Sequence, residues 1–301
     1  MANPLIEIQK FGQSIWYDNI RRGLITSGEL QSMVNEAGVL GVTSNPAIFT
    51  AAITGSPDYD QALQALVAQK VGTAVEIYEK LAIEDIQSAA DVLYAVYRRT
   101  NRVDGYVSFE VSPYLANDTE RSINEARRLC KAVQRENVMI KVPATPAGVP
   151  AIQQLIGDGI NINVTLLFAV EAYEKVADAY MSGLEQLAAK GGDLSKVASV
   201  ASFFVSRIDT LIDDRIAGPG QLLDATKDPV KRDKLKSLVG KVAIANAKLA
   251  FARFKELYGS DRWKALAAKG ARPQRLLWTR DRKSTRLNSS HIQKSRMPSS
   301  A

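Results

Sequence analysis

The sequence contains few of the residues on which many catalytic and metal sites depend. Cys130 is the single cysteine, so no disulfide can form within the chain, and this usage is typical of a reducing compartment. The single histidine, His291, lies in an atypical C-terminal tail. A histidine-based catalytic triad or zinc site in the body of the protein is therefore excluded.

Long apolar runs are also missing. No stretch stays apolar over the roughly 18 residues that a membrane span needs, and residues 1–10 have neither a signal-peptide nor a transit-peptide pattern. We therefore expect a cytoplasmic protein without a membrane partner. No glycine-rich phosphate loop follows the first predicted strand, which disfavours a nucleotide-binding fold.

The net charge of +7 is concentrated at one end of the chain. Residues 280–301 hold six basic residues and one aspartate, a net +5, which leaves +2 for the rest. That remainder lacks a basic stripe with interleaved aromatics, so we expect no nucleic-acid partner. The tail has no periodicity and resembles translated sequencing-adapter sequence. We predict that residues 280–301 are disordered and not native.

Seven short apolar or alternating runs separate longer helical patterns, which predicts parallel strands joined by helical crossovers. The runs cover residues 14–17, 39–43, 106–111, 138–142, 160–166, 197–205 and 274–278. They predict one α/β domain over residues 1–279, a (β/α)8 TIM barrel that is truncated before its eighth strand. A doubly wound open sheet is the alternative architecture.

Two helical patterns are the clearest. Residues 173–187 carry apolar side chains at helical spacing before the stop at Gly191-Gly192. A second helix opens at Asp228-Pro229, an N-cap followed by proline in the first turn, and its pattern continues to Ala252. We expect both helices to pack one apolar stripe inward.

One lysine interrupts an apolar strand. Lys141 lies between Ile140 and Val142, and the run ends at Pro143. Burial in general disfavours the ammonium form of lysine and favours the neutral amine, which is the form that attacks a carbonyl carbon. The alternative is a lysine whose ammonium reaches solvent or pairs with a carboxylate.

Polar residues close several of the predicted strands, where barrel enzymes carry their catalytic groups. They are Asp18, Thr43-Ser44-Asn45, Glu110, Asn163 with Thr165, and Ser202 with Arg207. Each alone has an ordinary structural explanation, such as a turn or a helix cap. Together with Lys141 they suit carbonyl chemistry on a phosphorylated, hydroxyl-rich substrate, and they contain no metal-binding cluster.

Five stretches around these residues closely resemble the transaldolase family, in the family's order. They are residues 41–49 (GVTSNPAIF), 109–112 (FEVS), 140–148 (IKVPATPAG), 159–168 (GININVTLLF) and 202–207 (SFFVSR). The resemblance covers residues 1–279 and implies a barrel of the class I aldolase type. It also implies a transferase of the pentose phosphate pathway, which moves dihydroxyacetone from sedoheptulose 7-phosphate to glyceraldehyde 3-phosphate without a cofactor or metal.

The resemblance also implies a role for each residue. Lys141 would form the Schiff base, and Asp18 would move the proton during carbon–carbon cleavage. Glu110 and Thr165 would hold the water that shuttles protons during imine formation. The sugar phosphate would be bound by Thr43, Asn45, Asn163, Ser202 and Arg207, the last through its phosphate.

Three alternatives remain open. The first is a class I aldolase of the fructose-6-phosphate type, against which Glu110 argues, because related aldolases tend to lack a carboxylate there. The second is a truncated, inactive chain, because family members continue after Trp278 with a phosphate-binding loop, an eighth strand and a final helix. The third is a genuine basic tail that binds nucleic acid in a salt-sensitive way.

Overall fold

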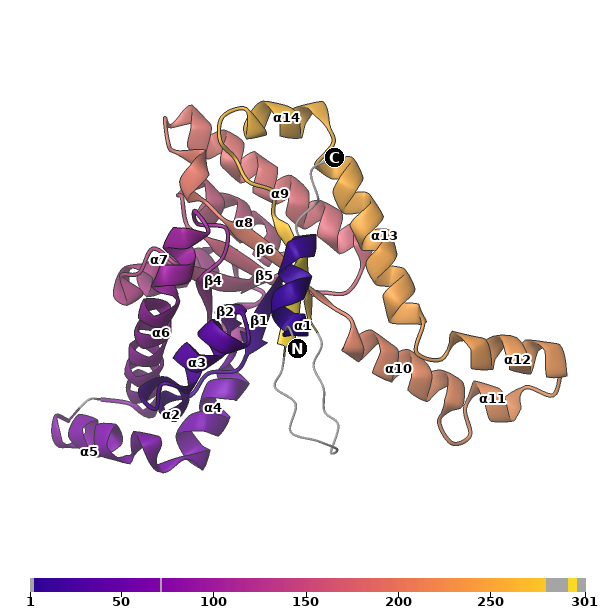
Figure 1. The fold of residues 1–301 in the computed structure, drawn as a ribbon, viewed down its shortest axis with the longest axis horizontal. Coiled ribbons are helices and arrows are strands. Elements are labelled where there is room, and N and C mark those ends of the chain that lie inside the picture. The colour runs from indigo at the N-terminus through magenta and orange to yellow at the C-terminus, as the bar shows by residue number, and fades with distance from the viewer. Residues whose placement is uncertain (1–2, 71, 280–291, 297–301) are drawn as a thin grey trace.

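The protein forms a barrel of parallel strands surrounded by helices in a computed structural model that describes residues 3–70, 72–279 and 292–296 (Figure 1). Seven parallel strands follow one another around the barrel in chain order. They are β1 (Gln13–Asp18), β2 (Val39–Thr43), β3 (Tyr106–Glu110), β4 (Val138–Pro143), β5 (Ile162–Leu167), β6 (Ser199–Phe204) and β7 (Arg275–Thr279). The predicted TIM-type architecture with seven parallel strands is confirmed, and the open-sheet alternative is wrong.

An eighth strand closes the barrel in an unexpected direction. β8 (Ile292–Arg296) lies between β7 and β1 and runs antiparallel to both, with Ser295 opposite Ser14 and Leu277. The prediction of disorder is therefore wrong for residues 292–296, while residues 280–291 and 297–301 lie outside the described residues. The free edges of β1 and β7 present backbone groups that an extended segment can satisfy whatever its side chains.

Helices pack around the barrel or project from it (Figure 1). They are α1 (Pro4–Glu7), α2 (Arg22–Thr26), α3 (Glu29–Glu36), α4 (Pro46–Gly55), α5 (Asp60–Ala68), α6 (Ala74–Arg99), α7 (Thr119–Val133), α8 (Gly148–Gly157), α9 (Val170–Ala189), α10 (Ser206–Ala217), α11 (Leu222–Ala225), α12 (Pro229–Leu238), α13 (Val242–Leu257) and α14 (Asp261–Ala267). Short 3₁₀ turns are η1 (Ile8–Phe11), η2 (Pro57–Tyr59), η3 (Pro113–Leu115) and η4 (Leu194–Lys196). Within the described residues, no helix is long and apolar enough to cross a membrane.

The two predicted helices have different outcomes. The helix expected over residues 173–187 is confirmed as α9, which buries the predicted stripe that includes Tyr173, Val176 and Tyr180. The helix expected from Asp228 to Ala252 is confirmed at its start, where Asp228 caps α12 with Pro229 in the first turn, but its continuity is wrong, because it is two helices, α12 and α13. The chain turns between them at Gly240, whose φ of +69° lies in the left-handed region that glycine adopts without strain.

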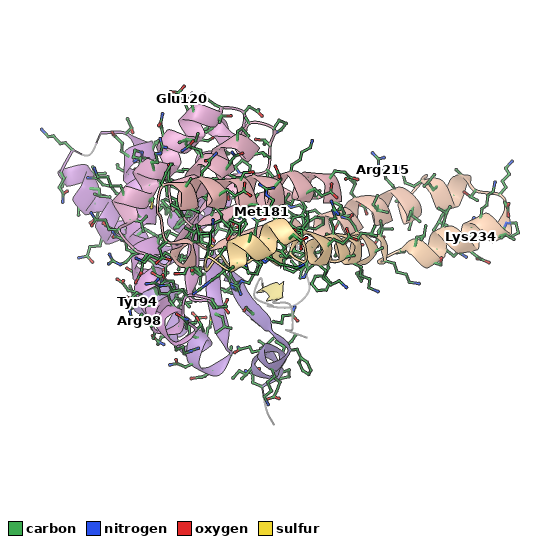
Figure 2. The ribbon with its side chains drawn as sticks, turned by 90° about the horizontal axis from the view of Figure 1, so that it is seen from above. Tyr94, Arg98, Glu120, Met181, Arg215 and Lys234 are labelled. Carbon is green, nitrogen blue, oxygen red and sulfur yellow. The ribbon has the colours of Figure 1, made fainter. Side chains whose placement is uncertain are left out.

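The expected inward-facing stripe is also absent from α12, which buries no residue. Helices α10, α11 and α12 form an arm, residues 206–238, that projects from the barrel. Figure 2 shows Arg215 and Lys234 on this arm, far from the strands. The arm returns to the barrel through α13, where the carboxylate of Asp209 accepts a hydrogen bond from the backbone N–H of Ala243 at 3.1 Å.

Residues that point into the barrel lie in layers, because side chains alternate between the two faces of each strand. Trp16, Met139, Val200 and Leu277 form a buried apolar layer inside the barrel. Two positions further along β4 from Met139, toward the carboxyl end of the strand, lies Lys141. The alternation that buries Met139 therefore also directs the lysine into the interior of the barrel.

Candidate active site

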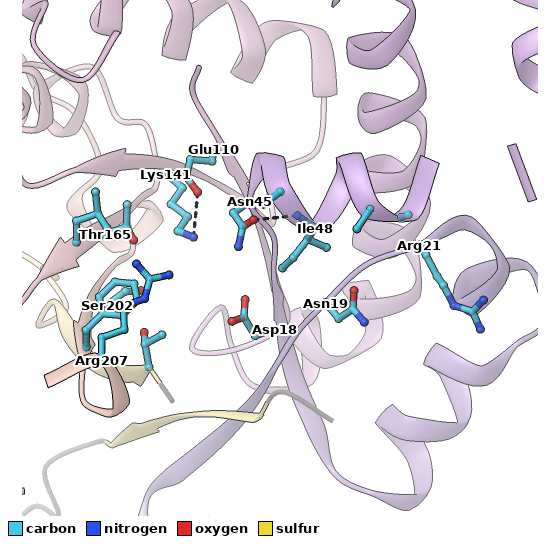
Figure 3. Close-up of a pocket in the computed structure, with 16 residues that line it drawn as sticks. Asp18, Asn19, Arg21, Asn45, Ile48, Glu110, Lys141, Thr165, Ser202 and Arg207 are labelled. Atoms are coloured by element: carbon cyan, nitrogen blue, oxygen red, sulfur yellow. Dashed lines mark hydrogen bonds and ion pairs between the residues drawn. The ribbon is translucent and has the colours of Figure 1, made fainter. Parts of the chain in front are cut away.

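A cavity of about 730 Å³ opens at the carboxyl ends of the parallel strands (Figure 3). Seven of the nine side chains expected in the site line it, namely Asp18, Asn45, Glu110, Lys141, Thr165, Ser202 and Arg207. They come from different strands or from the segments that follow them, so only the folded barrel brings them together. The other two expected residues, Thr43 and Asn163, are fully buried and do not line the cavity.

Lys141 lies at the floor of this cavity and is only 6% exposed. Its Nζ is 3.1 Å from Oε2 of Glu110, and it donates a hydrogen bond to the backbone carbonyl of Ser44 at 3.1 Å. The lysine thus pairs with a carboxylate, as a purely structural lysine would. It also faces a cavity that a substrate can enter. Glu110 is within proton-transfer distance of the amine.

A partly buried tyrosine, Tyr78, lies within the electrostatic influence of Glu110. The ring of Tyr78 lies edge-on against Phe49, with ring centroids 6.2 Å apart. Burial, and to a smaller extent the charge of Glu110, raises the pKa of Tyr78 to about 12. The phenol therefore stays neutral at physiological pH and adds no second negative charge beside Glu110.

A chain of hydrogen bonds behind the cavity wall fixes Ser202. The Ser202 hydroxyl donates to Oδ1 of Asn163 at 2.7 Å, and the Asn163 amide donates to the Ser108 hydroxyl at 2.9 Å. Asn163 is thus placed to orient Ser202 rather than to touch a substrate in the cavity. Thr43 is likewise behind the wall, and its hydroxyl has no hydrogen-bond partner within the described part of the chain.

Asn45 caps a helix and also lines the cavity. Its Oδ1 accepts a hydrogen bond from the backbone N–H of Ile48 at 2.9 Å and so caps α4, with Pro46 in the first turn (Figure 3). The amide is therefore held at a defined place on the cavity wall. Since its oxygen is occupied by the cap, Asn45 offers the cavity a hydrogen-bond donor.

The carboxylates of Glu110 and Asp18 reach the cavity from different sides (Figure 3). Asp18 is the last residue of β1, and Glu110 is the last residue of β3. Glu110 forms an ion pair with Lys141 at 3.1 Å. The site therefore holds one carboxylate next to the amine and a second across the space that a substrate would occupy.

Arg207 is held at the cavity by an aromatic stack. Its guanidinium carbon lies 4.5 Å from the ring centroid of Phe204, which in turn stacks on Phe168 at 4.9 Å. Stacking on a ring restricts the orientation of a guanidinium, and its N–H groups donate hydrogen bonds within the plane of the group. The fork is well suited to a phosphate oxygen pair.

Sequence reasoning missed further lining residues, including Asn19, Arg21, Leu166, Phe204 and Thr279. Asn19 and Phe204 had a signal, because they adjoin or lie within the stretches already singled out. Leu166 also lies within such a stretch, but no sequence signal marks its backbone: its φ of +62° is rare for leucine, and it coincides with a register shift between β5 and β6. This irregularity immediately follows Thr165 and exposes the leucine to the cavity.

The donor set of the site does not suit a metal ion. Within the described residues, no group of three or more His, Cys, Asp or Glu side chains is placed to hold one. An amine, two carboxylates, hydroxyls and a guanidinium instead provide a nucleophile, proton acceptors and an anion-binding group. This combination can form and break bonds next to a carbonyl carbon.

Comparisons with known proteins agree with this geometry. The family described as Transaldolase/Fructose-6-phosphate aldolase matches residues 15–280. "Transaldolase" of Trichodesmium erythraeum is 52% identical over 279 residues, and "Transaldolase 2" of a Nostoc species is 51% identical over 276 residues; each match covers 92% of this chain and 72% of the relative. "Transaldolase" of Saccharopolyspora erythraea is 47% identical over 268 residues, or 89% of this chain and 69% of that protein. This chain belongs to the transaldolase/fructose-6-phosphate aldolase family.

Proposed function

We propose that this protein is a transaldolase that transfers dihydroxyacetone from sedoheptulose 7-phosphate to glyceraldehyde 3-phosphate, giving erythrose 4-phosphate and fructose 6-phosphate. The observation that carries the proposal is the buried amine of Lys141, 3.1 Å from Glu110 at the floor of the cavity. The names of its relatives support the same activity. The single cysteine supports a cytoplasmic location.

Covalent chemistry begins at Lys141. Its neutral amine attacks the C2 ketone of the donor sugar, and Glu110, with a water held together with Thr165, moves the protons needed to expel the ketone oxygen as water. The resulting iminium withdraws electrons from the C3–C4 bond. Asp18 takes the proton from the C4 hydroxyl as that bond breaks, which releases the first aldehyde and leaves an enamine on Lys141.

The remaining groups hold the substrate. Ser202 and the Asn45 amide bind hydroxyls of the three-carbon unit, and Arg207 binds the phosphate at the far end of the sugar. Asn163 acts through Ser202, to which it is bound at 2.7 Å. The second aldehyde then enters, the enamine attacks its carbonyl carbon, Asp18 returns the proton, and hydrolysis of the new iminium frees Lys141.

Reductive trapping tests the proposal. The chain is incubated with fructose 6-phosphate and borohydride, and the added mass is mapped by peptide mass spectrometry. We expect a reduced adduct on Lys141 and none in Lys141→Met, which keeps the length of the side chain. An adduct on another lysine, or its persistence in Lys141→Met, would overturn the assignment. Absence of any adduct would favour an inactive chain.

Transfer and simple cleavage are separated by a second assay. A transaldolase consumes fructose 6-phosphate rapidly only when an acceptor such as erythrose 4-phosphate is present, because the enamine otherwise stays on the lysine. An aldolase of the fructose-6-phosphate type releases free dihydroxyacetone without an acceptor. The carboxylate of Glu110 favours transfer, and acceptor-independent release at the same rate would favour the aldolase.

A further inference from the structure

A second cavity, of about 270 Å³, lies at the opposite end of the barrel from the site described above. Its walls come from the amino ends of the strands: the segment before β3, the first residue of β6 and the segment that leads into β7. The side chains that matter are Asn101, Arg102, Arg272 and Arg275. We propose that this cavity binds a small phosphate-bearing metabolite.

The charge of the lining carries the proposal. Three arginines line the cavity, and none of its lining residues is acidic. Arg275 is compensated by Asp104 at 3.0 Å, and Arg102 lies 3.8 Å from Glu136. The carboxylate of Asp193 also acts on Arg102, but it is itself paired with Lys196 at 3.7 Å. Arg272 has no ion pair within the described residues, so its guanidinium leaves the lining with a positive charge that no side-chain partner there neutralises.

Arg272 also has a buried group without a partner. Its Nη1 is out of contact with solvent and makes no hydrogen bond within the described part of the chain. A buried guanidinium N–H that lacks an acceptor destabilises a fold, because it has lost its hydration without replacement. An anion in the adjoining cavity supplies the missing acceptor.

The walls of the cavity are held in place before any ligand arrives. The buried hydroxyl of Tyr106 donates to the backbone carbonyl of Arg102 at 2.8 Å, and that of Tyr180 donates to the carbonyl of Arg272 at 2.7 Å. Arg275 donates to the carbonyl of Val103 at 2.7 Å. A site whose arginine segments are already ordered loses little conformational entropy when it binds.

The chemistry of the lining selects the ligand class. Planar guanidinium groups bind phosphate oxygens in pairs, which makes arginine the preferred residue for this group. The Asn101 amide can bind a hydroxyl of an attached carbon skeleton. With about 270 Å³ against about 730 Å³ in the active-site cavity, the space fits a smaller molecule than a seven-carbon sugar phosphate.

A purely structural role explains only part of this arrangement. Arg275 joins three segments, because it donates to Asp104, to the Ser14 hydroxyl at 3.2 Å and to Val103. Contacts of this kind at the amino ends of barrel strands generally stabilise the fold. Arg272 does not belong to this set of contacts and, unlike Arg102 with Glu136, has no ion pair within the described residues, so its presence on the cavity wall calls for a different explanation.

The test is a titration with inorganic phosphate, followed by ³¹P NMR, on the full 301-residue chain carrying Arg207→Ala. That background weakens phosphate binding in the active-site cavity. We expect saturable binding of one phosphate per chain, and adding Arg272→Gln should raise its Kd at least about tenfold, since it removes charge-assisted hydrogen bonds. Arg272→Gln alone should leave dihydroxyacetone transfer unchanged.

Arg98→Gln is the matched control. Arg98 lies near the end of α6, four residues before Arg102, and is exposed rather than part of the cavity (Figure 2). Arg98→Gln removes one positive charge, as Arg272→Gln does. It should change the Kd for phosphate less than about twofold, because only screened long-range electrostatics are altered. Equal effects of Arg98→Gln and Arg272→Gln, or no saturable binding in the Arg207→Ala background, would overturn the proposal. If circular dichroism shows that Arg272→Gln is misfolded, Arg102→Gln is judged by the same criterion.

Discussion

The proposed role of Asp18, proton transfer during carbon–carbon cleavage, can be measured separately from imine formation at Lys141. We expect Asp18→Asn to keep imine formation, because the amine and Glu110 remain 3.1 Å apart, and to lose transfer by a factor of about 10²–10⁴, as for other lost general bases. Borohydride trapping and a transfer assay measure the two steps separately. Exposed Glu120→Gln is the control (Figure 2). Loss of trapping in a folded Asp18→Asn protein would contradict the assigned role.

Phe204 is expected to act on the substrate only through Arg207. Its ring lies 4.5 Å below the guanidinium, so Phe204→Leu should loosen Arg207 and raise the KM for fructose 6-phosphate about 2–30-fold, the range of a cation–π contact. Fructose without phosphate provides the control, since Arg207 has nothing to bind there. An equal rise in KM for both sugars would mean that the ring contacts the sugar itself.

One rule placed single residues at the cavity from the sequence, while their roles in the site stay predictions. Residues at the carboxyl ends of parallel strands meet on one rim, and Asp18, Glu110 and Thr165 were found in this way. The rule does not say which side chains are covered, so it could not separate Asn163 from Ser202, although the two are in contact. Nor could it find Leu166, whose left-handed backbone depends on a local shift of strand register.

At the scale of elements, close packing between α8 and α9 depends on Gly183. A Cβ there would lie 2.6 Å from the backbone carbonyl oxygen of Gln153 and 2.7 Å from Ile156. We expect Gly183→Ala to lower the free energy of unfolding by about 1–3 kcal/mol, because overpacking outweighs the gain in helix propensity. Urea denaturation measures this change.

Gly55→Ala is the matched control in α4, since nothing lies within 4 Å of the added Cβ. It should raise the free energy of unfolding by up to about 1 kcal/mol. If both variants were stabilised alike, α8 and α9 would have to move apart at little cost. A lower free energy of unfolding in Gly183→Ala together with a higher one in Gly55→Ala would support packing as the reason for glycine at position 183.

Elements that repeat a local pattern were predictable, and those set by a single residue were not. The run at residues 39–43 matches β2 in full, because its composition and its boundaries are both local signals. The break between α12 and α13 was missed because apolar spacing continues through Gly240, and one glycine within a helical pattern is usually tolerated.

At the scale of the whole molecule, closure of the barrel joins segments that are far apart in the chain. Arg275 at the start of β7 donates to Ser14 at the start of β1, 261 residues away, at 3.2 Å. β8 then lies between the same two strands. No local pattern in residues 292–296 predicts this position, because it is set by the backbone edges of β1 and β7 rather than by side chains.

The pairing of β8 with both neighbouring strands can be disrupted at Lys294. Lys294 pairs with Ile15 on one side and Trp278 on the other, so Lys294→Pro removes a backbone donor from a strand with two neighbours. We expect the free energy of unfolding to fall by roughly 1–3 kcal/mol. Binding of a hydrophobic dye and light scattering should rise, because the edges of β1 and β7 become available to other chains.

Ser300→Pro introduces the same residue outside β8 and is the control. Deletion of residues 280–301 should reproduce Lys294→Pro and exceed it, since it removes the whole strand from both edges. If deletion leaves the unfolding midpoint and the light scattering unchanged, β8 does not contribute to stability, and the seven parallel strands with their helices hold together without it. If only the deletion lowers the unfolding midpoint, the tail contributes to stability through something other than the backbone pairing at Lys294.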